Sequence, residues 1–284
     1  MMDLFDLFAK ITLDTGEYED GLKDAERKTS KFADTLKNGL ATAAKIGAAA
    51  IGTAATGISA LVKSSVDAYA NYEQLVGGVE TLFKTSSDKV MEYAANAYET
   101  AGMSANEYME TVTSFSASLL QSLDGDTAAA TEKANLAISD MSDNANKMGT
   151  SMEMIQNAYN GFAKQNYTML DNLKLGYGGT KEEMQRLLDD AEKLSGQKYE
   201  ISNLNDVYSA IHVVQTELGI TGSTATEAST TIQGSINQMK SAWENFVAGL
   251  MDSNADISAL TDNLVNSIVI AGKNILPAIL TFLP

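Results

Sequence analysis

Proline is almost missing from this chain. The two prolines are Pro277 and Pro284, so 276 residues precede the first one, where average usage of about 5% would place roughly a dozen. Proline breaks helix interiors and is common in the loops of mixed folds, and helix formers such as Ala, Leu, Met and Glu are plentiful instead. The sequence therefore predicts an all-α fold built from long amphipathic helices with short connections.

Negative charge is concentrated after residue 66. Residues 1–66 hold eight Lys and Arg against nine Asp and Glu, whereas residues 67–284 hold twelve against twenty-eight, a net charge of −16. An acidic domain repels phosphate, so we expect no sequence-specific binding of nucleic acid. The absence of cysteine excludes disulfides and thiolate metal sites. The absence of cysteine also fits assembly in the cytoplasm, and the N-terminus lacks the basic region of a secretion signal.

Two helices of different character are expected before residue 67. In residues 1–38, apolar side chains from Tyr18 to Leu36 recur in steps of four and three, which predicts an extended amphipathic helix with an exposed seam. Residues 39–66 form an apolar Ala/Gly-rich helix, and the seventeen residues 46–62 carry no charge. That length is at the lower limit of a membrane span, whereas small residues permit close helix packing. The stretch is either a packed helix of a soluble protein or a conditional membrane segment.

A compact, bundle-like helical core is predicted for residues 67–235. A Ser or Thr followed three residues later by Glu is the pattern of a capping box, which satisfies free backbone groups at a helix start. Amphipathic runs lie between these patterns, and the longest of them is either one unbroken helix or two helices divided at Gly149 and the Thr150 pattern. The pattern occurs at Ser104/Glu107, Thr150/Glu153, Thr180/Glu183 and Thr224/Glu227.

Residues 236–284 continue a heptad-like apolar pattern, which is typical of helices that associate with other helices. The chain ends on a bare apolar segment, Ile279–Pro284, so we interpret this region as the start of a truncated C-terminal part. The seam of this pattern begins slightly earlier and consists of Ile232, Ile236, Met239, Trp243, Phe246 and Leu250.

No set of residues in the sequence forms a recognisable catalytic, cofactor or metal site. His212 is the only histidine and lies in a helical run, where a packed or half-exposed position is expected. Gly176–Lys181 resembles a phosphate loop, but Thr180 precedes Lys181 and no strand comes before it, so a glycine turn and a helix cap are favoured. The methionines and Trp243 lie at helical spacing, which is typical of a core or an interface. We therefore predict a structural protein without enzymatic activity or cofactor.

Several segments resemble the tail tape measure proteins of long-tailed phages and prophages of Gram-positive bacteria. The resemblance extends from Tyr72 to Trp243, and its most specific part is the run ISDMSDNANKMG…DDAEKLSG from Ile138 to Gly196. Together these segments cover most of the chain. The other similar segments are residues 72–83, 97–123 and 228–246, and the opening 9–32.

The resemblance implies a structural protein that fills the lumen of the tail tube during assembly in the host cytoplasm and sets the length of the tube. It also implies that the protein leaves the virion tail on infection and helps the genome through the host envelope. The implied partners are the major tail tube protein, tail assembly chaperones, tail-tip proteins, further copies of the chain and the host membrane. The alternative is a secreted helical protein of the pore-forming type that uses residues 46–62, against which the missing secretion signal counts.

Overall fold

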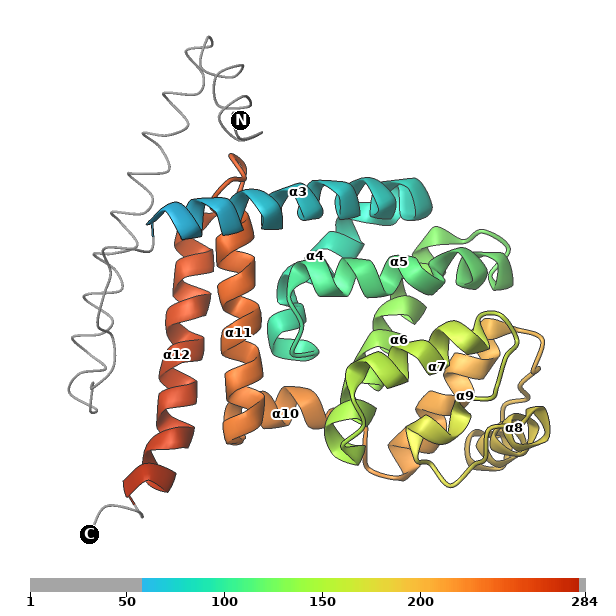
Figure 1. Cartoon of the computed structure of the whole chain (residues 1–284). Coiled ribbons are helices and arrows are strands. Elements are labelled where there is room, and N and C mark those ends of the chain that lie inside the picture. Colours follow the sequence, from blue (N-terminus) through green and yellow to red (C-terminus); the bar gives the residue numbers. More distant parts are fainter. Residues whose placement is uncertain (1–57, 281–284) are drawn as a thin grey trace, which may run out of the picture.

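The structure, a computed structural model of the chain, describes residues 58–280. Every regular element in this range is a helix, which confirms the predicted all-α fold (Figure 1). The helix predicted in residues 1–38 and most of the Ala/Gly-rich segment lie outside the described range. The elements are α3 (Ile58–Phe83), η2 (Lys84–Ser86), α4 (Ser87–Thr100), α5 (Ala105–Ser122), α6 (Thr127–Met148), α7 (Met152–Phe162), η3 (Leu170–Leu173), α8 (Lys181–Ser195), α9 (Leu204–Glu217), α10 (Ser223–Thr230), α11 (Ile232–Gly249) and α12 (Ile257–Leu280).

The main hydrophobic core lies among helices α3 to α9. Three aromatic rings meet in it: Tyr208 lies edge-on to Phe115 with centroids 5.6 Å apart, and tilted against Tyr159 at 5.0 Å. The Tyr208 hydroxyl also donates a hydrogen bond to the backbone carbonyl of Tyr159. Aromatic pairs add roughly 0.5–1.5 kcal/mol each beyond the burial of their area. Since the three residues belong to α5, α7 and α9, they hold three helices together.

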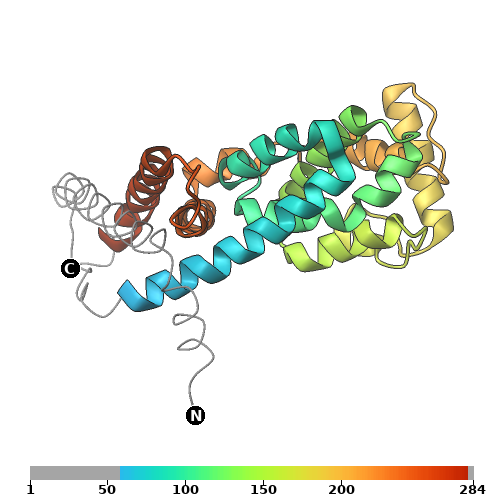
Figure 2. The same cartoon turned by 90° about the horizontal axis from the view of Figure 1, so that it is seen from above.

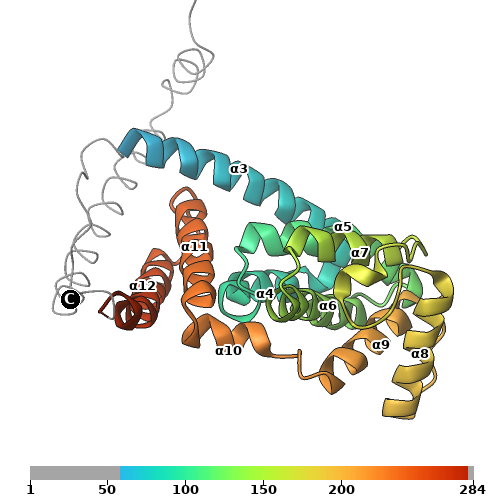
Figure 3. The same cartoon turned by 60° about the horizontal axis from the view of Figure 1, so that its bottom comes forward.

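The last three helices form a layer beside this core, and we call α10, α11 and α12 the C-terminal arm (Figures 1 and 3). Helices α11 and α12 run in opposite directions, and a second hydrophobic cluster between them includes Phe246, Leu250 and Leu264. Helix α3 contacts both α5 of the core and α11 of the arm, and the view from above shows it crossing the two (Figure 2). Core and arm therefore form one connected body.

Two of the four predicted helix starts are found where the sequence places them. Ser104 begins α5 with a complete capping box, in which its hydroxyl accepts from the Glu107 N–H and the Glu107 carboxylate accepts from the Ser104 N–H. Thr180 caps α8 through the N–H of Glu183. The Glu183 carboxylate accepts from the Gly178 N–H instead of completing the box.

The other two predicted starts are wrong. Helix α7 is capped by Ser151, because the Thr150 hydroxyl donates instead to the carbonyl of Asn172. Thr224 lies inside the first turn of α10, whose N-cap is Gly222. In both cases a residue distant in sequence forms a hydrogen bond with a group that the capping pattern assigns to the helix start. The Thr150 hydroxyl binds Asn172, and the Thr224 N–H binds Asp143.

Glycines decide where several helices end. Gly149 adopts φ +64° and separates α6 from α7, so of the two alternatives for the long amphipathic run the divided one is found. Gly176 adopts φ +89° just before the Thr180 cap, so the Gly176–Lys181 segment is a glycine turn and a helix start, as interpreted. At the corner between α10 and α11, a Cβ on Gly234 would lie 2.3 Å from the carbonyl oxygen of Glu227. Only glycine permits this close approach.

The heptad-like seam of α11 is buried only in its second half. Phe246 is fully buried and Leu250 is 8% exposed, whereas Ile232 and Trp243 are each 41% exposed. Trp243 nevertheless packs its ring against Phe246, with centroids 5.9 Å apart. No helix between residues 58 and 280 has the length and apolar character needed to cross a membrane.

Candidate functional site

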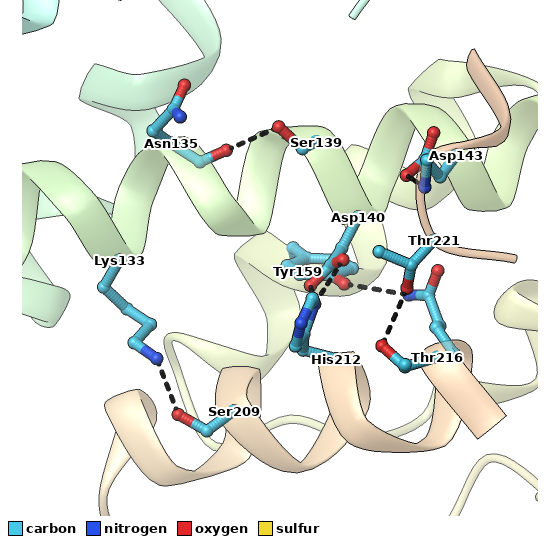
Figure 4. Close-up of polar contacts among 12 residues, drawn as sticks. Lys133, Asn135, Ser139, Asp140, Asp143, Tyr159, Ser209, His212, Thr216 and Thr221 are labelled. Carbon is cyan, nitrogen blue, oxygen red and sulfur yellow. Dashed lines mark hydrogen bonds and ion pairs between the residues drawn. The ribbon is translucent and has the colours of Figure 1, made fainter. Parts of the chain in front are cut away.

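Helix α6 carries an unusual number of polar side chains into the interior. Asp140, Ser142, Asp143 and Asn144 are all buried, although Asp and Asn are seldom buried unless their polar atoms are paired. The face of α6 that includes Lys133 and Asp140 lies against α9, which presents Ser209 and His212 (Figure 4). We call the residues Lys133, Asp140, Asp143, Ser209 and His212 the polar seam.

Asp140 and His212 form the central contact of the polar seam. The Nδ1 atom of His212 lies 2.8 and 3.1 Å from the two carboxylate oxygens of Asp140 (Figure 4). The Asp140 side chain is 1% exposed and the His212 side chain 29% exposed. The hydrogen bond to Asp140 raises the pKa of His212, because it favours the protonated ring. Burial raises the pKa of Asp140, and His212 opposes that shift. The expected half-exposed helix histidine is therefore found, with a buried carboxylate as its partner.

Lys133 and Ser209 superficially resemble a catalytic Ser–Lys pair. The Lys133 ammonium donates to the Ser209 hydroxyl at 2.8 Å, and burial lowers the pKa of Lys133. The Ser209 hydroxyl, however, donates its own proton to the carbonyl of Asn205 at 2.7 Å. An activated serine must give its proton to the base beside it, whereas here the amine is the donor. The arrangement is a hydrogen-bond chain that joins α6 to α9.

Asp143 attaches the C-terminal arm to the core. Its two carboxylate oxygens accept hydrogen bonds from the backbone N–H groups of Gly222 at 2.6 Å and Thr224 at 2.8 Å. The Ser223 hydroxyl donates to the backbone carbonyl of Asp143. A carboxylate at a helix N-terminus satisfies free N–H groups and complements the helix dipole. Asp143 therefore supplies from α6 the cap that α10 lacks locally.

Part of the buried polar interior is left without hydrogen-bond partners. Asn144 donates to the carbonyl of Leu173, and Gln215 donates to the Tyr159 hydroxyl at 3.4 Å, but the amide oxygens of both residues are buried without a partner. Burial raises the pKa of Tyr159 well above its ordinary value, so this phenol stays protonated. The two hydrogen bonds join α6 to η3 and α9 to α7.

The polar seam has no metal-binding arrangement. Within the described residues, no group of three or more His, Asp or Glu side chains could hold a metal ion. Sequence reasoning identified His212 but missed Asp140 and Asp143. Their positions gave no signal, because at helical spacing both lie away from the apolar stripe that contains Ile138 and Met141, where charged side chains are expected to be exposed.

A large cleft lies between the core and the C-terminal arm. It has a volume of about 780 Å³ and is lined by α5, the end of α6, α7, α10 and the start of α11. Five carboxamide side chains line it, and we call it the amide cleft. These residues are Asn146, Gln156, Asn160, Gln233 and Asn237.

Comparison with known protein families, with characterised proteins and with solved structures gave no match to this chain.

Proposed function

We propose that the chain is the N-terminal part of a phage tail tape measure protein, a structural protein that occupies the tail tube lumen and sets the length of the tube. The observation that carries the proposal is the resemblance from Tyr72 to Trp243, and above all its most specific segment, Ile138–Gly196. That segment spans the end of α6, all of α7 and η3, and α8.

Residues of the resembling segment support a structural role because they position helices. Met141, Tyr159 and Leu187 are fully buried in the main core. The glycine turn before α8 is demanded by packing, since a Cβ on Gly179 would lie 2.3 Å from the carbonyl oxygen of Thr168. The polar residues Asp140 and Asp143 join α6 to α9 and to the arm. These features account for the segment without a bound substrate.

The length of helical chain is also suited to the role. A helix rises 1.5 Å per residue, so 284 helical residues in line would span roughly 430 Å. The described residues instead fold back on themselves in a compact body (Figure 1). The proposal therefore includes a folded form before assembly and a more extended arrangement inside the tube, with the tube protein, assembly chaperones and tail-tip proteins as partners.

Deletion of the complete gene tests the proposed role. We expect cells that carry the phage or prophage without this gene to produce filled heads but no normal tails, and complementation in trans to restore the tails. Negative-stain electron microscopy of lysates measures both outcomes. Normal tails in the deletion strain would contradict the proposal and favour the alternative of a separate membrane-active protein.

A further inference from the structure

The amide cleft differs from an ordinary small-molecule pocket in its lining. Pockets for small ligands are lined mainly by apolar and aromatic side chains, but this cleft has no aromatic, Leu, Ile or Val residue among those that line it. Its walls combine carboxamides and hydroxyls with two methionines, Met103 and Met152, and six lining residues have no side chain beyond Cβ. These small residues are Ala101, Gly102, Ala145, Gly149, Ala228 and Gly234. Small residues allow another backbone to approach closely.

The two carboxamides that α7 presents to the cleft each use only one of their two polar groups within the described residues. Gln156 donates through Nε2 to the Thr111 hydroxyl, so its amide oxygen is available as an acceptor. Asn160 accepts through Oδ1 from the Ser114 hydroxyl, which leaves its NH₂ group as a donor. A carboxamide carries the same acceptor and donor groups as a peptide unit. Adjacent turns of α7 therefore present one acceptor and one donor.

The arm side of the cleft repeats this arrangement. Gln233 donates to the Oδ1 atom of Asn237, so the pair leaves the Gln233 oxygen and the Asn237 NH₂ group for other partners. On the core side, near the end of α6, Asn146 donates to Glu227 of the arm and retains its amide oxygen. No other hydrogen bond within residues 58–280 uses these atoms. Both walls thus offer acceptors and donors, which are the two kinds of group that the main chain of an extended polypeptide can pair with.

The charge of the cleft has one sign. Glu107 and Glu110, one turn apart on α5, are both exposed and line the cleft, and none of its lining residues is Lys, Arg or His. Glu110 has no ion pair within the described residues. A phosphate-bearing ligand is repelled by this lining, and a nucleobase finds no aromatic ring to stack on. A cationic side chain is favoured instead.

We infer that the amide cleft binds an extended segment of a partner polypeptide that carries a Lys or Arg side chain. The carboxamides pair with the backbone of the segment, the small Ala and Gly residues of the lining leave room for that backbone, and Glu107 with Glu110 receives the cation. This inference does not depend on the tape measure role, because it rests on the lining of the cleft alone.

The test selects a peptide and then asks where it binds. The full chain is immobilised and screened with a displayed library of random seven-residue peptides. The most enriched sequence is synthesised with a fluorescent label, and its Kd is measured by anisotropy. We expect enriched sequences to contain Lys or Arg, and binding to weaken as NaCl is raised, because exposed charges are screened by salt.

Variants then locate the binding site. Ser114→Arg places a cation and added bulk in the cleft at an exposed position, and the double variant Gln156→Ala/Asn160→Ala removes two carboxamides. Each should raise the Kd about tenfold or more, since tenfold corresponds to the loss of one or two hydrogen bonds. Gln185→Ala, a helix carboxamide outside the cleft, is the matched control and should leave the Kd unchanged. Thermal unfolding establishes that each variant is folded.

Two results would overturn the inference. One is a screen in which no peptide is enriched over a blank surface. The other is an enriched peptide that binds both cleft variants as tightly as it binds the unaltered chain, which places its site elsewhere.

Discussion

The carboxylate of Asp143 accepts a hydrogen bond of 2.6 Å from the backbone N–H of Gly222, a residue 79 positions further along the chain. This hydrogen bond and a second one, from the Thr224 N–H to the same carboxylate, hold the first turn of α10 against α6. The C-terminal arm is thus attached at its beginning by a buried charged group, with the amide cleft beside the attachment.

Removing this carboxylate should destabilise the protein strongly. Asp143→Ala loses two hydrogen bonds to a charged acceptor and leaves two N–H groups of α10 without partners, so we expect a loss of about 3 kcal/mol in the free energy of unfolding. Asp143→Asn retains one acceptor and should lose roughly half as much. Urea unfolding followed by circular dichroism measures both.

The matched control is Asp126→Ala, which removes an exposed local cap at the start of α6 and should cost about 1 kcal/mol. An Asp143→Ala variant no less stable than the Asp126→Ala variant would contradict the role of Asp143 as the attachment of the arm.

The Asp140–His212 pair should make stability depend on pH. The pKa of His212 is raised in the folded protein, so the pair contributes its full stability below the unfolded pKa of about 6.5 and loses it as pH rises through the folded pKa. We expect the free energy of unfolding to fall as pH rises from about 6.5 through the folded pKa of His212. His212→Gln should make the free energy of unfolding less dependent on pH in this range. Because His212 is the only histidine, its ring titration by NMR assigns the pKa directly. A folded pKa at or below 6.5 would be incompatible with the pairing.

Two adjacent glycines provide a test of the turn before α8. A Cβ on Gly179 would lie 2.3 Å from the carbonyl oxygen of Thr168, whereas a Cβ on Gly178 would meet only the flexible side chain of Glu183 at 3.5 Å. Gly179→Ala should therefore cost about 2 kcal/mol or more through overpacking, and Gly178→Ala less than about 1 kcal/mol. Equal stabilities of the two variants by thermal unfolding would refute the packing explanation.

The acidic chain should neither bind duplex DNA nor hydrolyse nucleotides. Residues 67–284 carry a net charge of −16, and the Gly176–Lys181 segment is a turn and a helix cap. We expect no electrophoretic shift of duplex DNA at physiological salt and no release of phosphate from ATP by the full chain. Retention of DNA, or ATP turnover that Lys181→Ala abolishes, would show that a phosphate site had been overlooked.

Local chemistry in the sequence was sufficient for the helical class and for several boundaries. The complete box of Ser104 with Glu107, the end of α6 at Gly149 and the turn at Gly176 all depend on residues within a few positions of one another. Sequence spacing predicts such features because the interacting groups are fixed by the helix itself.

Features that depend on distant partners were not predictable in this way. Thr224 satisfies the spacing of a cap, but the Asp143 carboxylate already binds its N–H from another helix. Thr150 has the same spacing, yet its hydroxyl is drawn to the carbonyl of Asn172. The amide cleft likewise exists only because α10 and α11 fold back beside α5 and α7, so no pattern within a single helix indicates it.

The central claim, that this chain sets the length of a tail tube, is tested most directly by changing the length of the complete gene in frame. Coding segments outside residues 58–280 are duplicated or deleted, and tails are measured by electron microscopy. A helical rod predicts that tail length changes in proportion, by about 1.5 Å per residue added or removed. Tails of unchanged length, assembled with the altered protein inside them, would contradict the claim.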